Sequence, residues 1–223
     1  MLKLAKFHNW LIFLIVGRDL KKRLAQYASG VMVDIGCGEK PYQKMAAAYV
    51  QKHVGVDHSD TFHNKSRIDL VGTAYKIPYG NESCDSILCT AVLEHLEAPD
   101  LAIAEAFRIL RSGGYAIYTV PLFWHLHEEP RDFYRYTKYG LEYLFEKNGF
   151  EIIEISALTG FCVTFAQELV YYIQRFRKGR WLNPLWWTIP FISTIIQVLG
   201  YLLSIIDHSE GYTALYIAVV KKP

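Results

Sequence analysis

The sequence predicts an α/β protein built on a parallel sheet. Residues 31–35 form a short apolar run typical of a buried strand, which leads into a turn with glycines at 36 and 38. A second short strand, predicted over 53–56, ends in Asp57. A strand, a glycine turn, a helix, a second strand and a terminal acid form the pattern of a nucleotide-binding βαβ unit. Asp57 is therefore placed to accept hydrogen bonds from both ribose hydroxyls of a ligand.

Composition narrows the class of protein. The chain has 223 residues, enough for one domain with a full core and an appendage, and 52% of them are hydrophobic. A net charge of +2 is too small to indicate nucleic-acid binding. The four cysteines show neither disulfide nor metal spacing, so we expect reduced thiols and a cytoplasmic protein. They are Cys37, Cys84, Cys89 and Cys162.

The glycine turn discriminates between two ligands. A dinucleotide site needs G-x-G-x-x-G, but Pro41 stands at the third glycine position. The form Asp34-x-Gly36-x-Gly38 instead resembles motif I of class I S-adenosylmethionine-dependent methyltransferases. That ligand has no phosphate and needs no phosphate cradle. On this motif alone, a tight turn in an unrelated α/β fold remains an alternative.

Further motifs extend the resemblance to the methyltransferase family that includes the ubiquinone-biosynthesis enzymes. Residues 75–79 with Cys84-Asp85, residues 90–96 and residues 108–115 each resemble a segment of that family, in the same order. The resemblance covers roughly residues 28–156 and the last strand. It implies a Rossmann-like, seven-stranded, mostly parallel sheet whose last strand is antiparallel, with S-adenosylmethionine as cofactor.

Proline, glycine and capping residues predict the bounds of the remaining helices and strands. Pro41 and Pro99 suit the first turns of helices, Gly113-Gly114 and Gly149 end helices, and Thr137 suits an N-cap. The expected strands are 31–35, 53–56, 67–72, 86–90, 115–120, 150–156 and 213–220, and the expected helices are 2–24, 42–50, 99–110, 138–148 and 161–176.

The resemblance assigns the cofactor contacts. Asp34 would hold the ammonium group, the glycine turn would leave room for the carboxylate and thioether, and Asp57 would hold the ribose. Thr73, with Ala74 next to it, stands where the family usually has an acid that bonds the adenine amine, which is a departure from the pattern. Thr73 and Thr90 could equally be strand-end caps. The predicted cofactor residues are Asp34, Gly36, Cys37, Gly38, Asp57, Thr73, Ala74 and Thr90.

Residues 125–137, after the fifth strand, concentrate histidine, carboxylate, arginine and aromatic side chains in a loop. Their Pro-x-Asp-Phe-x-Arg-x-Thr pattern resembles a subset of methyltransferases found with cell-envelope polysaccharide genes. Methyl transfer to a hydroxyl needs a base near the oxygen. His127 is the first candidate for that base, followed by His125 and Asp132. The expected substrate contacts are His95, Tyr134 and Arg135, although Asp132 and Arg135 could simply pair to hold the loop.

A metal site is not predicted. Some relatives bind a divalent metal through Glu-x-x-Glu-His, but Ala91 stands at the first glutamate position of that pattern. Glu94 and His95 would remain, and two ligands rarely suffice, although His125 and His127 could add nitrogen donors. Glu94 and His95 are instead expected to begin or cap a helix beside the site.

The expected domains are an N-terminal helical segment over 1–27 and a methyltransferase domain over 28–223, with an apolar insertion at 160–208. In the N-terminal segment, an apolar stripe from Phe7 to Ile15 precedes a basic stretch. This helix either covers the mouth of the ligand site or lies in the membrane interface with its basic end on anionic lipid.

The insertion between the last two strands carries no charge from Trp181 to Ile206. Asn183, Pro184 and Pro190 are expected to break this run into one or two helices lying in the membrane interface. The alternative is a helical subdomain that packs on itself or on a second copy of the chain. In the membrane hypothesis, Trp181, Trp186 and Trp187 lie at headgroup depth, and Arg175, Arg177, Lys178 and Arg180 contact phosphates.

The sequence therefore predicts a methyltransferase that acts on a hydroxyl of a glycan or lipid-linked intermediate at the inner face of the membrane. A methyltransferase for a quinone or another small apolar substrate is the second hypothesis. The third, of another class, is a non-catalytic, membrane-associated binding protein with the cofactor fold. Nucleic acid is not an expected partner.

Overall fold

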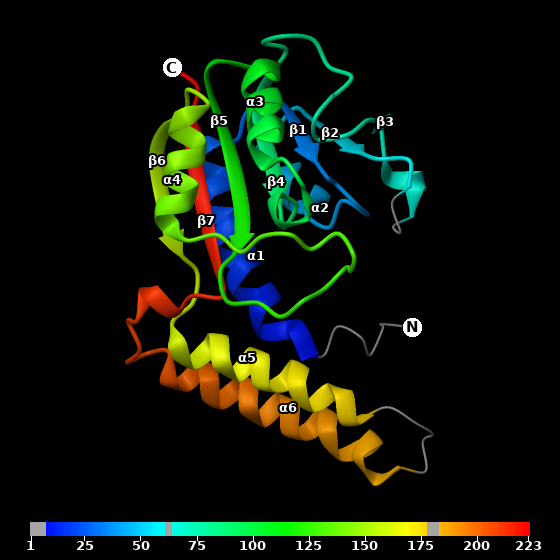
Figure 1. The fold of residues 1–223 in the computed structure, drawn as a ribbon, viewed down its shortest axis with the longest axis vertical. Coiled ribbons are helices and arrows are strands. Elements are labelled where there is room, and N and C mark those ends of the chain that lie inside the picture. Colours follow the sequence, from blue (N-terminus) through cyan, green and yellow to red (C-terminus); the bar gives the residue numbers. More distant parts are fainter. Residues whose placement is uncertain (1–7, 61–63, 178–182) are drawn as a thin grey trace. The chain divides into compact units, whose positions relative to one another are not determined.

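The computed structural model describes residues 8–60, 64–177 and 183–223 and contains one seven-stranded sheet (Figure 1). The strand order is β3-β2-β1-β4-β5-β7-β6, and β1 pairs in parallel with both β2 and β4. The predicted fold class is confirmed: six strands are parallel and the last is antiparallel. The strands are β1 Val31–Ile35, β2 Lys52–Asp57, β3 Leu70–Val71, β4 Cys84–Thr90, β5 Leu110–Pro121, β6 Glu151–Ala157 and β7 Leu215–Lys221.

Six α-helices accompany the sheet in the described residues. They are α1 Trp10–Tyr27, α2 Gln43–Ala46, α3 Pro99–Ile109, α4 Lys138–Lys147, α5 Phe161–Gln174 and α6 Pro184–Leu203. Short 3-10 turns occur at η2 Lys65–Arg67, η3 Leu93–His95, η4 Arg175–Arg177 and η5 Glu210–Tyr212.

The chain forms two compact units. The sheet unit comprises residues 20–121, 126–156 and 216–223, and the helical unit comprises residues 1–19, 122–125 and 157–215. In the sheet unit, the central strands β1 and β4 bury nearly all of their side chains, as expected for parallel strands covered on both faces.

Two elements are shorter than the sequence predicts. The helix expected over 42–50 is reduced to α2, and Tyr42 before it makes no side-chain capping bond. The strand expected over 67–72 is reduced to β3. Arg67, the first residue of the expected strand, instead ends η2, whose N-cap Asn64 accepts a hydrogen bond from Ser66 N.

Within the helical unit, α5 and α6 form an antiparallel pair (Figure 1). Gln174 Nε2 donates to Ser193 Oγ over 3.0 Å. Farther along the pair, a Cβ on Gly200 would lie 2.6 Å from Ala166 Cβ, so glycine allows the two helices to approach closely. The start of α1 joins the pair through Leu11 N, which donates to Gln197 Oε1.

The prediction that Pro190 breaks the apolar insertion is wrong. Helix α6 runs through Pro190, and Asn183 and Pro184 begin it, with Asn183 Oδ1 accepting from Leu185 N over 3.0 Å. Proline cannot donate to the carbonyl four residues earlier. That carbonyl, of Trp186, instead accepts a hydrogen bond from Arg177 Nε over 3.2 Å. The predicted roles of Trp181, Lys178 and Arg180 lie outside the described residues.

Candidate functional site

A cavity of about 270 Å³ opens in the sheet unit where β1 and β2 end. This is the carboxyl edge of the parallel strands, where open α/β sheets bind ligands. The lining residues are Ile35, Gly36, Val56, Asp57, His58, Gly72, Thr73, Ala74, Tyr75, Val92, His95, Leu96, Glu97 and Arg131.

The turn after β1 shapes this cavity. Gly36 has a φ of +67°, and a Cβ there would lie 2.5 Å from Cγ2 of Val92, so glycine is required on two grounds. Gly38 N donates to Asp57 Oδ2 over 2.9 Å, and His58 N donates to Asp57 Oδ1 over 2.7 Å. A carboxylate has about four lone-pair sites, so Asp57 is held in place and can still accept from ribose hydroxyls. The cavity therefore fits the adenosyl part of S-adenosylmethionine.

The cavity contains only some of the predicted cofactor residues. Gly36, Asp57, Thr73 and Ala74 line it, whereas Asp34, Cys37, Gly38 and Thr90 do not.

Asp34 is buried and lies 2.9 Å from His53 Nε2. Burial raises the pKa of Asp34, and the hydrogen bond with His53 acts in the opposite direction. The predicted contact of Asp34 with the ammonium group stays a prediction.

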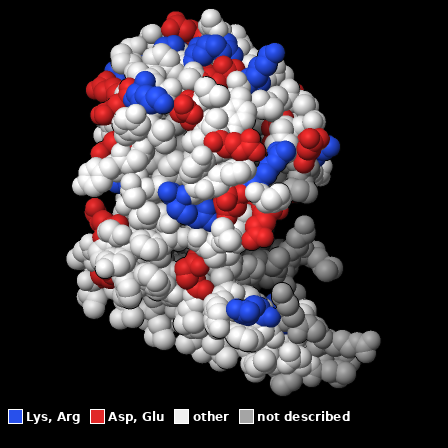
Figure 2. All heavy atoms as spheres, viewed as in Figure 1, with Lys and Arg blue, Asp and Glu red and all other residues white. Residues whose placement is uncertain are grey.

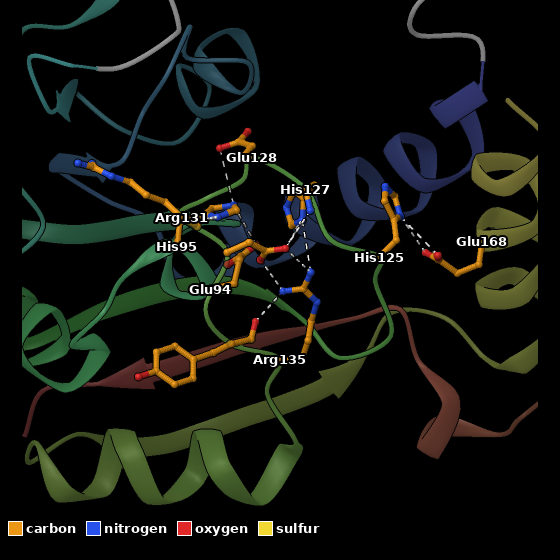
Figure 3. Close-up of polar contacts among 10 residues, drawn as sticks. Glu94, His95, His125, His127, Glu128, Arg131, Arg135 and Glu168 are labelled. Carbon is orange, nitrogen blue, oxygen red and sulfur yellow. Dashed lines mark hydrogen bonds and ion pairs between the residues drawn. The ribbon is translucent and has the colours of Figure 1, made fainter. Parts of the chain in front are cut away.

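A polar cluster adjoins the cavity through His95, which lines its wall (Figure 3). The rings of His95 and His127 pack edge to face, with centroids 4.7 Å apart. Asp132 Oδ2 accepts from His127 N over 2.9 Å. Arg135 donates to both Asp132 oxygens over 2.6 and 2.8 Å. Asp132 and Arg135 thus pair, as the alternative interpretation expected, while also holding the loop that carries His127.

The charged and buried surroundings of His127 suit its side chain to accept a proton. Burial and the neighbouring His95 lower the pKa of His127, so its imidazole is neutral near pH 7. The Arg135 guanidinium holds the pKa of Asp132 well below its usual range, so Asp132 stays ionised beside the ring. A neutral imidazole oriented by a carboxylate can act as a general base.

Glu94 lies close to the two histidines. Its side chain is 1% exposed, and Oε2 has no hydrogen-bond partner among the residues described. Burial raises the pKa of Glu94 to about 8. The sequence prediction gave Glu94 only a helix-end role, because spacing alone could not show that its carboxyl group points into the protein.

The other predicted residues lie as follows. His125 belongs to the helical unit, where its Nδ1 lies 3.4 Å from Glu168 and its ring packs on Tyr171. Tyr134 donates its hydroxyl hydrogen to the carbonyl of Glu97, a residue of the cavity wall. Of the three candidate bases, the sheet unit therefore brings together His127 and Asp132.

Comparison with known proteins agrees with this geometry. The family described as "Methyltransferase domain" matches residues 33–118, which contain the end of β1, the glycine turn and most of the cavity wall. Over residues 33–118 the chain therefore resembles a methyltransferase domain.

Two curated relatives each match about half of the chain. A probable S-adenosylmethionine-dependent methyltransferase of Mycolicibacterium smegmatis is 28% identical over 107 residues, 45% of this chain and 42% of the relative. The ubiquinone biosynthesis O-methyltransferase of Nitrosomonas europaea is 24% identical over 124 residues, 51% of this chain and 50% of the relative. The chain thus matches half or less of the length of both. These matches confirm the predicted class and cofactor for the domain.

Among solved structures, the Haemonchus contortus phosphoethanolamine N-methyltransferase 2 in complex with S-adenosylhomocysteine resembles nearly the whole chain. The TM-score is 0.56, with 17% identity, over 96% of this chain and 56% of that one. At this identity the likeness shows the fold.

Sequence reasoning missed several residues of the cavity wall. His58 directly follows the strand-end acid Asp57, so its position was a usable signal. Arg131 reaches the cavity from the loop after β5, which the sequence indicated as a whole without assigning a contact to this arginine. His53 was expected only as a strand residue, yet it is the partner of Asp34.

Proposed function

We propose that this protein is an S-adenosylmethionine-dependent methyltransferase that methylates a hydroxyl group of a glycan or lipid-linked intermediate at the cytoplasmic face of a membrane. The observation that carries the proposal is the position of His95. It lines the cavity that fits the cofactor and also packs on His127, so the polar cluster adjoins the place where a methyl group would be transferred.

Each residue has a defined part in this chemistry. S-adenosylmethionine supplies an activated methyl group when bound. Asp57 holds the ribose, and Thr73 and Ala74 form the wall expected to lie against the adenine. His127 accepts the proton of the acceptor hydroxyl, and Asp132 orients the imidazole ring. Positioning the hydroxyl in line with the methyl carbon supplies much of the remaining rate enhancement.

Membrane contact is supported by the surface of the helical unit. Helix α6 contains no charged residue, and of the described helices only this one is long and apolar enough to cross a bilayer, over Leu185–Leu203. Only 22% of that stretch is buried. The visible face of this pair of helices is mostly uncharged (Figure 2). Exposed apolar residues of α6 include Leu185, Trp187, Phe191, Ile192, Ile195, Val198, Leu199 and Leu202.

The geometry of the helical pair favours insertion into one leaflet over a single crossing. Leu158 N donates to Leu215 O over 3.0 Å, so the pair begins and ends at neighbouring points of the chain. A single crossing would separate those points. At the far end of the pair, Arg175 and Arg177 supply positive charge that attracts anionic headgroups, by about 1 kcal/mol each near the surface.

A quinone or other small apolar acceptor is the second candidate, because one relative is a ubiquinone biosynthesis O-methyltransferase. An apolar acceptor dissolved in the membrane would use the same surface. A non-catalytic binding protein is a third candidate, but the oriented His127 and Asp132 beside the cavity favour catalysis.

The test is methyl transfer from methyl-labelled S-adenosylmethionine to two acceptor pools: a glycolipid fraction and a set of hydroxylated quinone precursors. Label in the glycolipid fraction that is abolished in Asp57→Ala supports the proposal. Label only in the quinones transfers the assignment to the second candidate. Cofactor binding with no transfer to either pool contradicts the proposed acceptor.

Liposome flotation tests the membrane contact separately. Phe191→Ser changes a side chain of α6 that is 70% exposed, and Tyr139→Ser is its control, a 78% exposed aromatic residue of α4. We expect Phe191→Ser to weaken flotation with anionic vesicles and Tyr139→Ser to leave it unchanged. A wild-type protein that stays in the aqueous fraction with anionic vesicles contradicts the proposed contact.

A further inference from the structure

Three potential metal-binding groups converge beside the cavity wall, and the proposed function uses only one of them as a base. Glu94 and His95 come from η3, and His127 comes from the loop after β5 (Figure 3). One ligand atom from each lies within 4.8 Å of the other two. Ligand atoms bound tetrahedrally to one zinc ion at about 2.0–2.2 Å lie roughly 3.4 Å apart, so side-chain rotations that draw the three atoms together by about 1 Å would bring them into range.

We propose that Glu94, His95 and His127 bind one divalent transition-metal ion, with Zn²⁺ as the ion that this donor set fits best. Two imidazoles and one carboxylate are a known zinc ligand set for sites that keep a further position open. Imidazole donors favour zinc and its neighbours, whereas Mg²⁺ favours oxygen ligands.

The buried carboxyl group of Glu94 is an independent indication of a ligand. Oε2 has no hydrogen-bond partner among the described residues, and the side chain is 1% exposed. A buried polar group normally has a partner, and a buried carboxylate needs positive charge nearby. A cation between Glu94 and the histidines would meet both requirements.

The surroundings of the two imidazoles resemble those of metal ligands. His95 Nδ1 donates to the Arg131 carbonyl over 2.6 Å, which turns Nε2 toward the other donors. Nε2 of His95 lies 4.0 Å from Glu94 Oε1 and 3.8 Å from Glu128 Oε2, so two carboxyl groups face it. His127 Nδ1 lies 3.4 Å from Asp132 Oδ2 and 3.5 Å from Arg135 Nη2. A histidine held by a carbonyl, as His95 is, is a usual arrangement around a bound metal, and Asp132 lies near His127 in a comparable position.

Sequence reasoning did not predict this site, because Ala91 stands where some relatives have their first glutamate. His127 supplies the third donor from a part of the chain more than thirty residues away. Glu128, which is exposed, is available as a fourth donor.

The role of the ion rests on the proposed function, because the ion would act on the methyl acceptor. An open coordination position beside the cavity wall would bind the acceptor oxygen, orient it and lower the pKa of its hydroxyl group. His127 is then a metal ligand, and the proton of the bound hydroxyl group would pass to solvent water. Without an ion, His127 remains the candidate base.

The experiment measures metal binding without reference to catalysis. Chelator-stripped protein is titrated with Co²⁺, followed by its visible absorption, and with Zn²⁺ against a chromophoric chelator; Mg²⁺ is the contrast. We expect one Zn²⁺ per chain and no displacement by millimolar Mg²⁺. Glu94→Gln and His127→Gln should each weaken Zn²⁺ binding at least a hundredfold. Asp132→Asn, which weakens the contacts that hold the loop and orient His127, should weaken it about tenfold.

His208→Ala is the matched control, a histidine of the helical unit outside the cluster, and it should bind Zn²⁺ as the wild type does. Thermal unfolding of each stripped variant verifies that it is folded. Glu94→Gln keeps the shape of the side chain and removes a buried acid, so we expect it to fold. Zn²⁺ affinity that is equal in Glu94→Gln and wild type overturns the proposal, as does the lack of stoichiometric Zn²⁺ binding by the wild type. Neither outcome affects S-adenosylhomocysteine binding, which tests the proposed function on its own.

Discussion

Gly36→Ala places a methyl group in the turn that shapes the cofactor cavity. Two costs add. The φ of +67° is unfavourable for a residue with a Cβ, by on the order of 1–2 kcal/mol. The new Cβ would also lie 2.5 and 3.0 Å from the two methyl carbons of Val92, and overpacking of this kind costs about 1–3 kcal/mol. A lower entropy of the unfolded chain offsets about 0.4–1 kcal/mol. We therefore expect a net destabilisation of about 1–4.6 kcal/mol.

Gly113→Ala is the matched control. Gly113 has a similarly positive φ of +81°, but a Cβ there would meet no atom within 4 Å. It shares the backbone cost and the entropy offset and lacks the clash, so Gly36→Ala should be less stable by about 1–3 kcal/mol. Urea unfolding of both variants measures this difference. Calorimetry with S-adenosylhomocysteine should show weaker binding only for Gly36→Ala. Equal stability of the two variants would refute the reasoning about Val92.

Three further outcomes are expected. Thr137→Ala removes the N-cap hydrogen bond that Gly140 N donates to Thr137 Oγ1 over 3.1 Å, and should lower the free energy of urea unfolding by about 1 kcal/mol. Thr137→Ser should be close to wild type. An equal loss of stability in both variants would contradict the capping role. Burial raises the pKa of Cys37 and Cys84 to about 12, so at pH 8 both thiols stay protonated. Mass spectrometry should show iodoacetamide labelling only after unfolding, and labelling at the unfolded rate in folded protein would contradict this. His127→Ala should lower kcat about a hundredfold and leave cofactor affinity unchanged; an unchanged kcat would remove His127 from the chemistry.

Strong local signals predicted much of the fold. The apolar runs of β1 and β4, Pro99 at the start of α3 and Thr137 before α4 each match a structural element, because a single physical effect dominates at each position. Elements with weaker local signals depended on contacts with other parts of the chain. The helix expected after Pro41 lacks a capping side chain and shrinks to α2, and the break expected at Pro190 fails because Arg177 satisfies the Trp186 carbonyl.

The candidate site likewise contains residues that the sequence predicted and residues that it did not. Gly36 and Asp57 line the cavity because they belong to one continuous strand-turn-strand pattern. The environment of Glu94 could not be predicted, since the loop whose Phe133 N and Tyr134 N donate to the Glu94 carbonyl lies more than thirty positions away. Periodicity and spacing describe near neighbours along the chain, whereas a cluster such as Glu94, His95 and His127 is assembled only by the fold.

Calorimetric binding of S-adenosylhomocysteine tests the central claim most directly. We expect the wild type to bind it and to bind NAD far more weakly. Asp57→Ala and Asp57→Asn should lose tenfold or more in affinity, because each charge-assisted hydrogen bond to the ribose contributes on the order of 1.5–3 kcal/mol. Asp60→Ala, an exposed acid of the same loop, should bind as the wild type does. Unaltered affinity in the Asp57 variants, or binding of NAD as tight as that of S-adenosylhomocysteine, would contradict the account.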